Sequence, residues 1–88
     1  MQLFYTPQAI KQLEKLPPTI ARRIVNKMDW FMVQAKPLSF ANKLSHTSEE
    51  TWRFRIGDFR ALCRIRDGML QILAVLSIKH RREVYRNL

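Results

Sequence analysis

Arginine recurs at alternate positions in two neighbouring segments of the chain, where apolar residues separate the charges. The positions are Arg53, Arg55, Arg60, Arg64 and Arg66. Each guanidinium group is a planar, permanently charged set of donors that fits a phosphate group. Several such groups around one phosphate can stabilise the charge that develops during phosphoryl transfer. A solvated outer face is the simpler interpretation, but the dominance of one charge sign favours an anionic ligand.

A basic tail follows, and it carries two groups that can transfer a proton, His80 and Tyr85. Lys79, Arg81 and Arg82 lie beside them in the sequence. An RNA strand can be cleaved through its own 2′-OH if a site supplies a proton acceptor, a proton donor and charge stabilisation. Alone, either residue is more typical of packing or of a surface. Because they lie in the same basic region as the arginines, the two residues together favour chemistry on RNA.

Other chemistries lack a matching pattern. His46 and His80 have no cysteine partners, and neither His-x-x-x-His nor Cys-x-x-Cys spacing occurs, so we expect no metal ion. Both glycines of the chain fall in candidate hairpin turns, which leaves no glycine-rich phosphate loop. Nothing local supports a Ser-His-Asp triad, and we expect no cofactor.

Three antiparallel strands are predicted to position the arginines, at residues 52–56, 59–66 and 69–78. The first alternates apolar and basic residues, as a half-buried strand does. Gly57-Asp58 fits a type II′ turn and Asp67-Gly68 a type I′ turn, so both connections would be two-residue hairpins. Residues 72–76 are apolar on both faces, which is typical of a strand inside a sheet.

Turns of two residues fix the register of such a meander. The first turn pairs three apolar residues of each strand: Ile56–Phe59, Phe54–Ala61 and Trp52–Cys63. The second turn would continue this apolar face with Cys63–Ile72, Ala61–Ala74 and Phe59–Leu76. We expect this face to lie on helices, with Cys63 in the core. The other face would carry the five arginines with Leu62, Gln71, Leu73 and Val75.

Arg55 falls directly opposite Arg60 in this register. Like charges opposed across a sheet destabilise it. A fold that keeps such a pair is expected to use it on an anionic ligand. Removing Arg60 is then expected to leave stability level or to raise it.

The first forty residues predict a strand and two helices. Gln2–Tyr5 is the strand, and Thr6-Pro7 starts the first helix, with Thr6 as N-cap. Pro17-Pro18 ends it, and the second helix starts at residue 17 or 18 or after a Thr19 cap. The second helix has an apolar stripe made of Ile20, Ile24, Met28, Phe31 and Met32. It faces the sheet, and Arg22, Arg23, Lys27 and Asp29 lie away from it.

The segment 40–44 is either an edge strand or a short turn of helix, and 45–50 is a polar loop. The predicted fold class is α+β in the order β-α-α-β-β-β, with an antiparallel helical hairpin on one face of the sheet. The length of 88 residues predicts a single domain spanning residues 1–88.

The composition gives 16 Lys and Arg against 7 Asp and Glu, a net charge of +9. Such a surface suggests nucleic acid or an acidic protein as partner. No apolar run approaches the roughly 20 residues that cross a bilayer, and no signal peptide is visible, so we expect a cytoplasmic protein without a membrane partner. Cys63 is the only cysteine, which excludes an internal disulfide.

Several segments together resemble the RelE/ParE toxin superfamily. They are residues 52–60 with the Gly57-Asp58 turn, the apolar strand, the terminal run 80–86, the hairpin broken at 16–18 and the segment 42–44. The resemblance spans nearly the whole chain and implies a RelE-like fold and a bacterial toxin with a cognate antitoxin. RelE-like members cleave mRNA in the ribosomal A site without a metal ion, whereas other members poison gyrase.

We therefore expect a ribosome-dependent, metal-independent endoribonuclease that acts by 2′-OH attack on mRNA. A gyrase inhibitor without nuclease activity is the alternative, and a basic RNA-binding module without toxicity is a third possibility. The expected partners are the antitoxin, the ribosome and mRNA, and the toxin–antitoxin complex would bind operator DNA through the antitoxin.

The resemblance also implies residue roles. The catalytic candidates are Arg60, Arg81, Tyr85 and His80, with Lys79 in place of Arg81 if no gap is allowed. The RNA-binding candidates are Arg53, Arg55, Arg64, Lys79 and Arg82. Two departures matter: arginine replaces lysine at positions 53 and 55, and no glutamate is expected on the sheet face. The group that accepts the 2′-OH proton is therefore unassigned.

Overall fold

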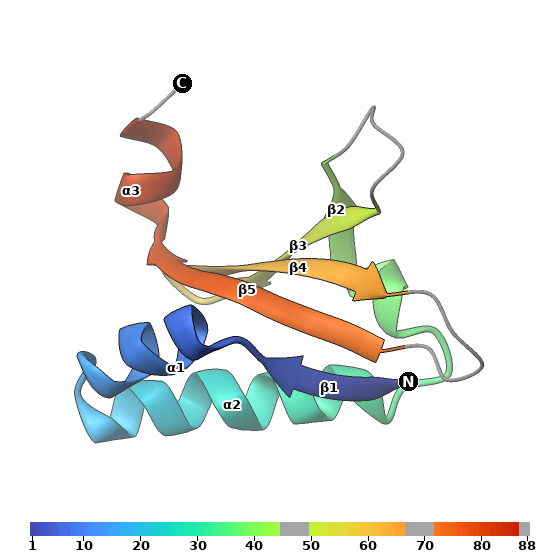
Figure 1. Cartoon of the computed structure of the whole chain (residues 1–88), viewed down its shortest axis with the longest axis horizontal. Coiled ribbons are helices and arrows are strands. Elements are labelled where there is room, and N and C mark those ends of the chain that lie inside the picture. The colour runs from blue at the N-terminus through green and yellow to red at the C-terminus, as the bar shows by residue number, and fades with distance from the viewer. Residues whose placement is uncertain (45–49, 67–71, 87–88) are drawn as a thin grey trace.

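The computed structural model describes residues 1–44, 50–66 and 72–86, which form a five-stranded sheet with helices on both sides. The strand order is β1-β5-β4-β3-β2. β1 (Gln2–Tyr5) runs parallel to β5 (Ile72–His80), and the other neighbouring strands pair antiparallel. Helices α1 (Pro7–Glu14) and α2 (Pro18–Met32) cover one face of the sheet (Figure 1). The predicted α+β class is confirmed.

Thr6 links the first strand to the first helix. Its Oγ1 accepts a hydrogen bond from the N–H of Ala9 at 3.2 Å, as an N-cap does. The same hydroxyl donates to the carbonyl of Leu76 at 3.0 Å, and Gln12 of α1 accepts from the N–H of Ile78 at 2.6 Å. β1 ends at Tyr5, opposite Val75, and cannot pair with the rest of β5. The side chains of Thr6 and Gln12 therefore satisfy backbone groups of β5 beyond Val75.

The helix α2 begins at Pro18, with Pro17 in the cap position. Its predicted apolar stripe is confirmed, because Ile24, Met28 and Phe31 are buried against the sheet. The Phe31 ring lies 4.9 Å from the ring of Phe54, centroid to centroid.

The hairpin of β3 (Thr51–Ile56) and β4 (Phe59–Arg66) has the predicted register. The pairs Ile56–Phe59, Phe54–Ala61, Trp52–Cys63 and Arg55–Arg60 are all present. Gly57 has φ +58°, and no residue other than glycine has a positive φ in the described segments. A positive φ at the first central position alone is the signature of a type II′ turn.

The predicted register between β4 and β5 is wrong. Cys63 lies opposite Val75, Ala61 opposite Ile78 and Phe59 opposite His80. The pairing is irregular between Leu62 and Cys63, whose partners are Ser77 and Val75, so Leu76 is a bulged residue. Leu73 and Val75 therefore belong to the core rather than to the arginine face, and both are fully buried.

The bulge also changes the pairing of the charged residues. Beyond Leu76, Ser77 and Lys79 lie on the arginine face, opposite Leu62 and Arg60. The Asp67-Gly68 turn, Gln71 and the predicted strand start at residue 69 lie outside the described residues.

The middle of the chain combines both alternatives that the sequence left open. A 3-10 helix, η1 (Pro37–Phe40), leads into a short edge strand, β2 (Ala41–Lys43), which pairs with β3. The predicted polar loop that follows lies outside the described residues, except for Glu50.

The tail, for which no element was predicted, forms α3 (Arg81–Arg86). It stands on the side of the sheet opposite to α1 and α2 (Figure 1). None of the helices in the described segments is both long enough and apolar enough to span a membrane.

Candidate functional site

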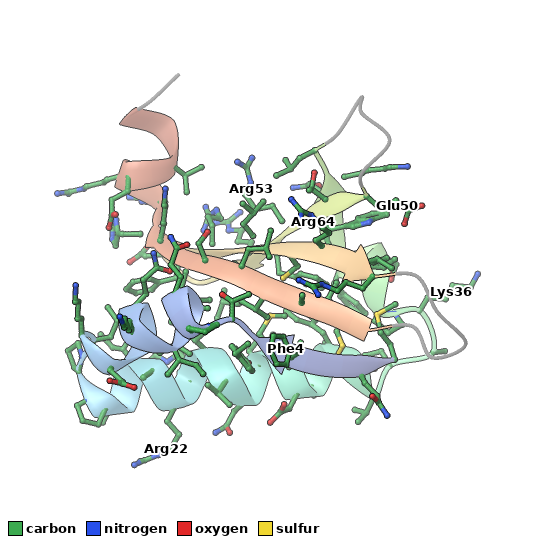
Figure 2. All side chains as sticks on the ribbon, in the orientation of Figure 1. Phe4, Arg22, Lys36, Glu50, Arg53 and Arg64 are labelled. Atoms are coloured by element: carbon green, nitrogen blue, oxygen red, sulfur yellow. The ribbon has the colours of Figure 1, made fainter. Side chains whose placement is uncertain are left out.

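A pocket of about 270 Å³ opens on the sheet face that α1 and α2 do not cover. Four charged residues line it, namely Arg53, Arg60, Lys79 and Glu83. Leu44, Leu62, Ser77 and Val84 complete the lining. Figure 2 shows Arg53 on this side of the sheet, above the strands. Three strands and α3 thus bring three cations and one carboxylate to one pocket.

A row of positive charges crosses the sheet beside this pocket. Arg60 of β4 has Arg55 of β3 as its partner on one side and Lys79 of β5 on the other. Like charges on directly opposed positions are unfavourable, and here they are repeated on two strand pairs. The arrangement is suited to a ligand with dense negative charge, such as a phosphodiester.

Arg60 is held from beneath by the hairpin turn. Only 8% of its surface is exposed, and its Nη1 donates to the carbonyls of Gly57 and Phe59 at 2.9 Å each. These bonds fix the orientation of the guanidinium group, which is the preorganisation that charge stabilisation requires. They also reverse the stability expectation drawn from the sequence, because removing the Arg60 side chain would remove two hydrogen bonds to the turn.

Arg81 does not line the pocket. Its backbone N–H donates to the carbonyl of Asp58 at 2.7 Å, and its Nε lies 3.8 Å from Asp58 Oδ1. Both side chains are more than half exposed, so the ion pair itself adds little stability. Arg81 therefore ties the start of α3 to the β3–β4 turn, and Lys79, the predicted alternative to Arg81, lines the pocket instead.

His80 lies on the other face of the sheet from the row of cations. It is opposite Phe59, and the two rings meet edge to face with centroids 5.4 Å apart. Its Nδ1 accepts a hydrogen bond from the N–H of Arg82 at 3.2 Å. A side chain that accepts from the second residue of the following helix acts as an N-cap. The structure gives His80 a place at the start of α3 rather than one in the pocket.

The other predicted site residues lie outside the pocket or outside the described side chains. Arg55 is exposed and Arg64 partly buried on the arginine face, and Arg82 is exposed on α3. Tyr85 belongs to α3, but its side chain lies outside the described part of the structure.

Glu83 is a functional candidate that sequence reasoning missed. It stands in α3 and lines the pocket with Lys79 and Arg53. The sequence offered one signal, the run 81–86 that can form a helix after the third strand. Its significance depends on α3 rising from the end of β5 on the open side of the sheet, which strand pairing does not predict. A carboxylate at this position can accept a proton from a ligand bound to the cations.

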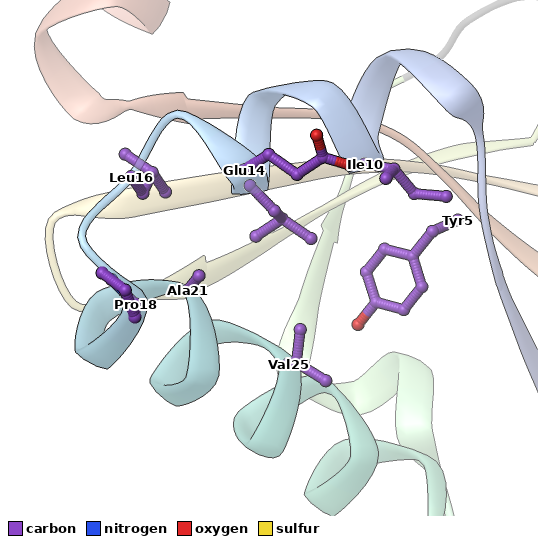
Figure 3. Close-up of a pocket in the computed structure, with 8 residues that line it drawn as sticks. Tyr5, Ile10, Glu14, Leu16, Pro18, Ala21 and Val25 are labelled. Atoms are coloured by element: carbon purple, nitrogen blue, oxygen red, sulfur yellow. The ribbon is translucent and has the colours of Figure 1, made fainter.

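A second pocket, of about 530 Å³, lies between α1 and α2 (Figure 3). Its lining is almost wholly apolar, with Glu14 as its one charged residue. Burial, assisted by the charge of Asp29, raises the pKa of the Tyr5 hydroxyl at its wall. The second pocket therefore has neither the cations nor an acidic hydroxyl that anion chemistry would use.

Cys63 is not a candidate nucleophile. It is fully buried in the core, as predicted, and burial raises the pKa of its thiol from 9.0 to about 12. The reactive form of cysteine is the thiolate, which this environment disfavours at neutral pH.

Comparison with known proteins identifies a family. The sequence model of the ParE toxin of type II toxin–antitoxin systems, parDE, matches residues 3–85. Comparison with curated proteins gives no match.

Two solved structures share the fold. A chain of the toxin–antitoxin complex RelBE2 from Mycobacterium tuberculosis superposes with a TM-score of 0.71 and 29% sequence identity, over 91% of this chain and 96% of that one. A chain of the RelB–RelE antitoxin–toxin complex from Methanococcus jannaschii superposes with a TM-score of 0.65 and 17% identity, over 97% and 98% of the two chains. The expected RelE-like architecture is confirmed by these likenesses.

Proposed function

We propose that this chain, which belongs to the family of ParE toxins of type II toxin–antitoxin systems, is a ribosome-dependent endoribonuclease acting on mRNA in the A site. The observation that carries the proposal is the row of cations Arg55, Arg60 and Lys79 beside Arg53 on the open sheet face. Such a row costs stability unless an anion offsets it. A phosphodiester supplies that anion, whereas inhibition by protein binding alone does not require one.

In the proposed reaction the 2′-oxygen of a ribose attacks the adjacent phosphorus, and the bond from phosphorus to the 5′-oxygen of the next nucleotide breaks. The 2′-OH loses a proton and the departing 5′-oxygen gains one, so the products are a 2′,3′-cyclic phosphate and a 5′-OH end. No step needs a metal ion.

The residues of the pocket divide these tasks. Arg53 and Arg60 would stabilise the non-bridging oxygens as negative charge develops on them. Glu83 would accept the 2′-OH proton, and either the Lys79 ammonium or the Tyr85 hydroxyl would donate to the leaving oxygen. Arg81 and His80 would act indirectly, by holding α3 and therefore Glu83 over the sheet.

We also propose a cognate antitoxin as partner, since the two solved relatives are components of toxin–antitoxin complexes. The net charge of +9 favours an acidic segment that folds on binding and covers part of the arginine face. The toxin–antitoxin complex would then bind operator DNA through the antitoxin.

A second candidate function is inhibition of gyrase without cleavage, which the ParE description of the matching family favours. The two functions separate after induction of the protein in growing cells. A nuclease stops bulk translation and shortens transcripts while plasmid supercoiling is unchanged. A gyrase inhibitor changes supercoiling first.

Purified components give the direct test. We expect the pure protein to cut mRNA on programmed ribosomes and to bind, but not cut, the same mRNA alone. Rapid cutting of naked RNA by the pure protein would contradict the proposed dependence on the ribosome. Intact mRNA together with altered plasmid supercoiling would contradict the nuclease function and support inhibition of gyrase.

A further inference from the structure

The outer face of α2 carries a second group of cations, on the side of the molecule away from the pocket. Arg22, Arg23 and Lys27 line a shallow hollow of about 470 Å³ together with Thr19, Asn26 and Trp30. All six residues are exposed. Figure 2 shows Arg22 pointing away from the sheet, on the side opposite to Arg53 and Arg64.

The charge of this hollow is of one sign. No carboxylate lines it, and in the described segments none of its three cations forms an ion pair. The α2 residues that face the sheet are apolar, so the cations are not needed to balance buried acids. A surface of this kind favours an anionic macromolecule.

Trp30 adds an aromatic surface to the charge. The residue is 44% exposed, and the Nζ of Lys27 lies 4.1 Å from the ring centroid. Edge contacts with Phe31 and Phe40, at centroid distances of 5.7 and 5.2 Å, hold the ring in place. A fixed aromatic ring beside arginines is a combination that binds RNA through stacking and phosphate contacts.

We propose that this face of α2 is a second RNA-binding surface, which docks on the phosphate backbone of structured ribosomal RNA while the pocket acts on mRNA. Arg22 and Trp30 are eight residues apart, or about 12 Å along the helix axis. That distance corresponds to three or four steps of about 3.4 Å along one strand of a duplex. An acidic peptide fits less well, because Trp30 is the one large apolar side chain that lines the hollow.

The position of the two surfaces supports a partner that surrounds the protein. Cations on opposite sides of the sheet cannot contact one short RNA strand together. They can contact two walls of an RNA-lined cavity. The choice of the ribosome as the partner rests on the proposed function. The contact between α2 and RNA can be tested separately.

The test compares two triple variants of the full chain with equal charge. R22Q/R23Q/K27Q removes the cations of the hollow, and the control K11Q/K15Q/K36Q removes three other exposed lysines. The first probe is a 20-base-pair RNA duplex at several salt concentrations. We expect the α2 variant to lose at least tenfold in affinity, with a salt slope smaller by about 2 to 3, and the control to lose less than threefold.

The second probe is cleavage on programmed ribosomes. For the α2 variant we expect KM to rise about tenfold with kcat unchanged, because the residues dock the protein and do not touch the scissile phosphate. Equal effects of the two variants on the duplex, or no effect of the α2 variant, would overturn the proposal. So would an α2 variant that loses antitoxin binding and keeps duplex binding. If the wild-type protein binds the duplex through α2 but cuts no mRNA on ribosomes, the proposed nuclease function is wrong and the proposed RNA-binding surface is supported.

Discussion

Arg60 shows how one residue can serve the fold and the site together. Its burial and its two hydrogen bonds to the turn carbonyls make it a structural residue. Its place between Arg55 and Lys79 makes it part of the proposed phosphate site. The sequence predicted the pairing with Arg55 but not the contacts with the carbonyls, because a side chain that folds back on its own turn leaves no mark in the strand pattern.

We predict that Arg60→Ala lowers the free energy of unfolding by about 1–3 kcal/mol, since it removes two hydrogen bonds from a charged donor to turn carbonyls. The matched control is Arg55→Ala, which removes an exposed charge from the directly opposed position. It relieves the like-charge pair and should leave stability level or raise it slightly. Urea unfolding measures both. Equal stability of the two variants would show that the Arg60 bonds contribute nothing.

Cys63 gives the stability a dependence on pH. The folded chain keeps the thiol protonated up to pH about 12, whereas the unfolded chain ionises it above pH about 9. The unfolded state therefore binds fewer protons between these values, and the free energy of unfolding falls as pH rises.

We predict that wild type loses about 1.4 kcal/mol more than Cys63→Ala between pH 8 and pH 10. Urea titrations at both pH values measure the difference. Parallel losses in the two proteins, or fast modification of the native thiol by a maleimide at pH 8, would contradict the buried, protonated thiol.

The elements were predictable where local chemistry determines them. The Thr6 cap, the α2 stripe and the β3–β4 register follow from single residues or a two-residue turn. The β4–β5 register does not, because the bulged residue Leu76 is contacted at its carbonyl by Thr6, 70 residues away, and strand pattern and turn length do not report such a contact. α3 has six residues, too few to show a repeating helical pattern in the sequence, and its first residue is bonded to the turn at Asp58.

The role of His80 can be tested at the level of α3. We predict that His80→Ala lowers stability by about 0.5–2 kcal/mol and slows cleavage, because α3 loses its cap. His80→Asn should restore most of both, since asparagine is a good N-cap but a poor acid or base. Thermal melts and cleavage on ribosomes measure the two properties. If His80→Asn restores stability but not cleavage, His80 takes part in proton transfer rather than only capping α3.

At the scale of the molecule, cations gather on two opposite faces, around the pocket and along the outer side of α2. The sequence predicted an anionic partner from the sum of the charges. It named Lys79 as an RNA-binding candidate, but it did not predict that Glu83 joins the pocket, because that placement depends on the direction of α3. The central claim is that the pocket bordered by these residues stabilises a scissile phosphate.

Single-turnover cleavage on saturating programmed ribosomes tests that claim most directly. The variants are Arg53→Gln, Lys79→Gln and Glu83→Gln, and the control is Arg66→Gln, an exposed arginine of β4 that does not line the pocket. We predict that each pocket variant cleaves about 10²–10³ times more slowly with unchanged thermal stability, and that the control cleaves like wild type. Pocket variants that cleave at the wild-type rate, or a control that is equally slow, would contradict the assignment of the site.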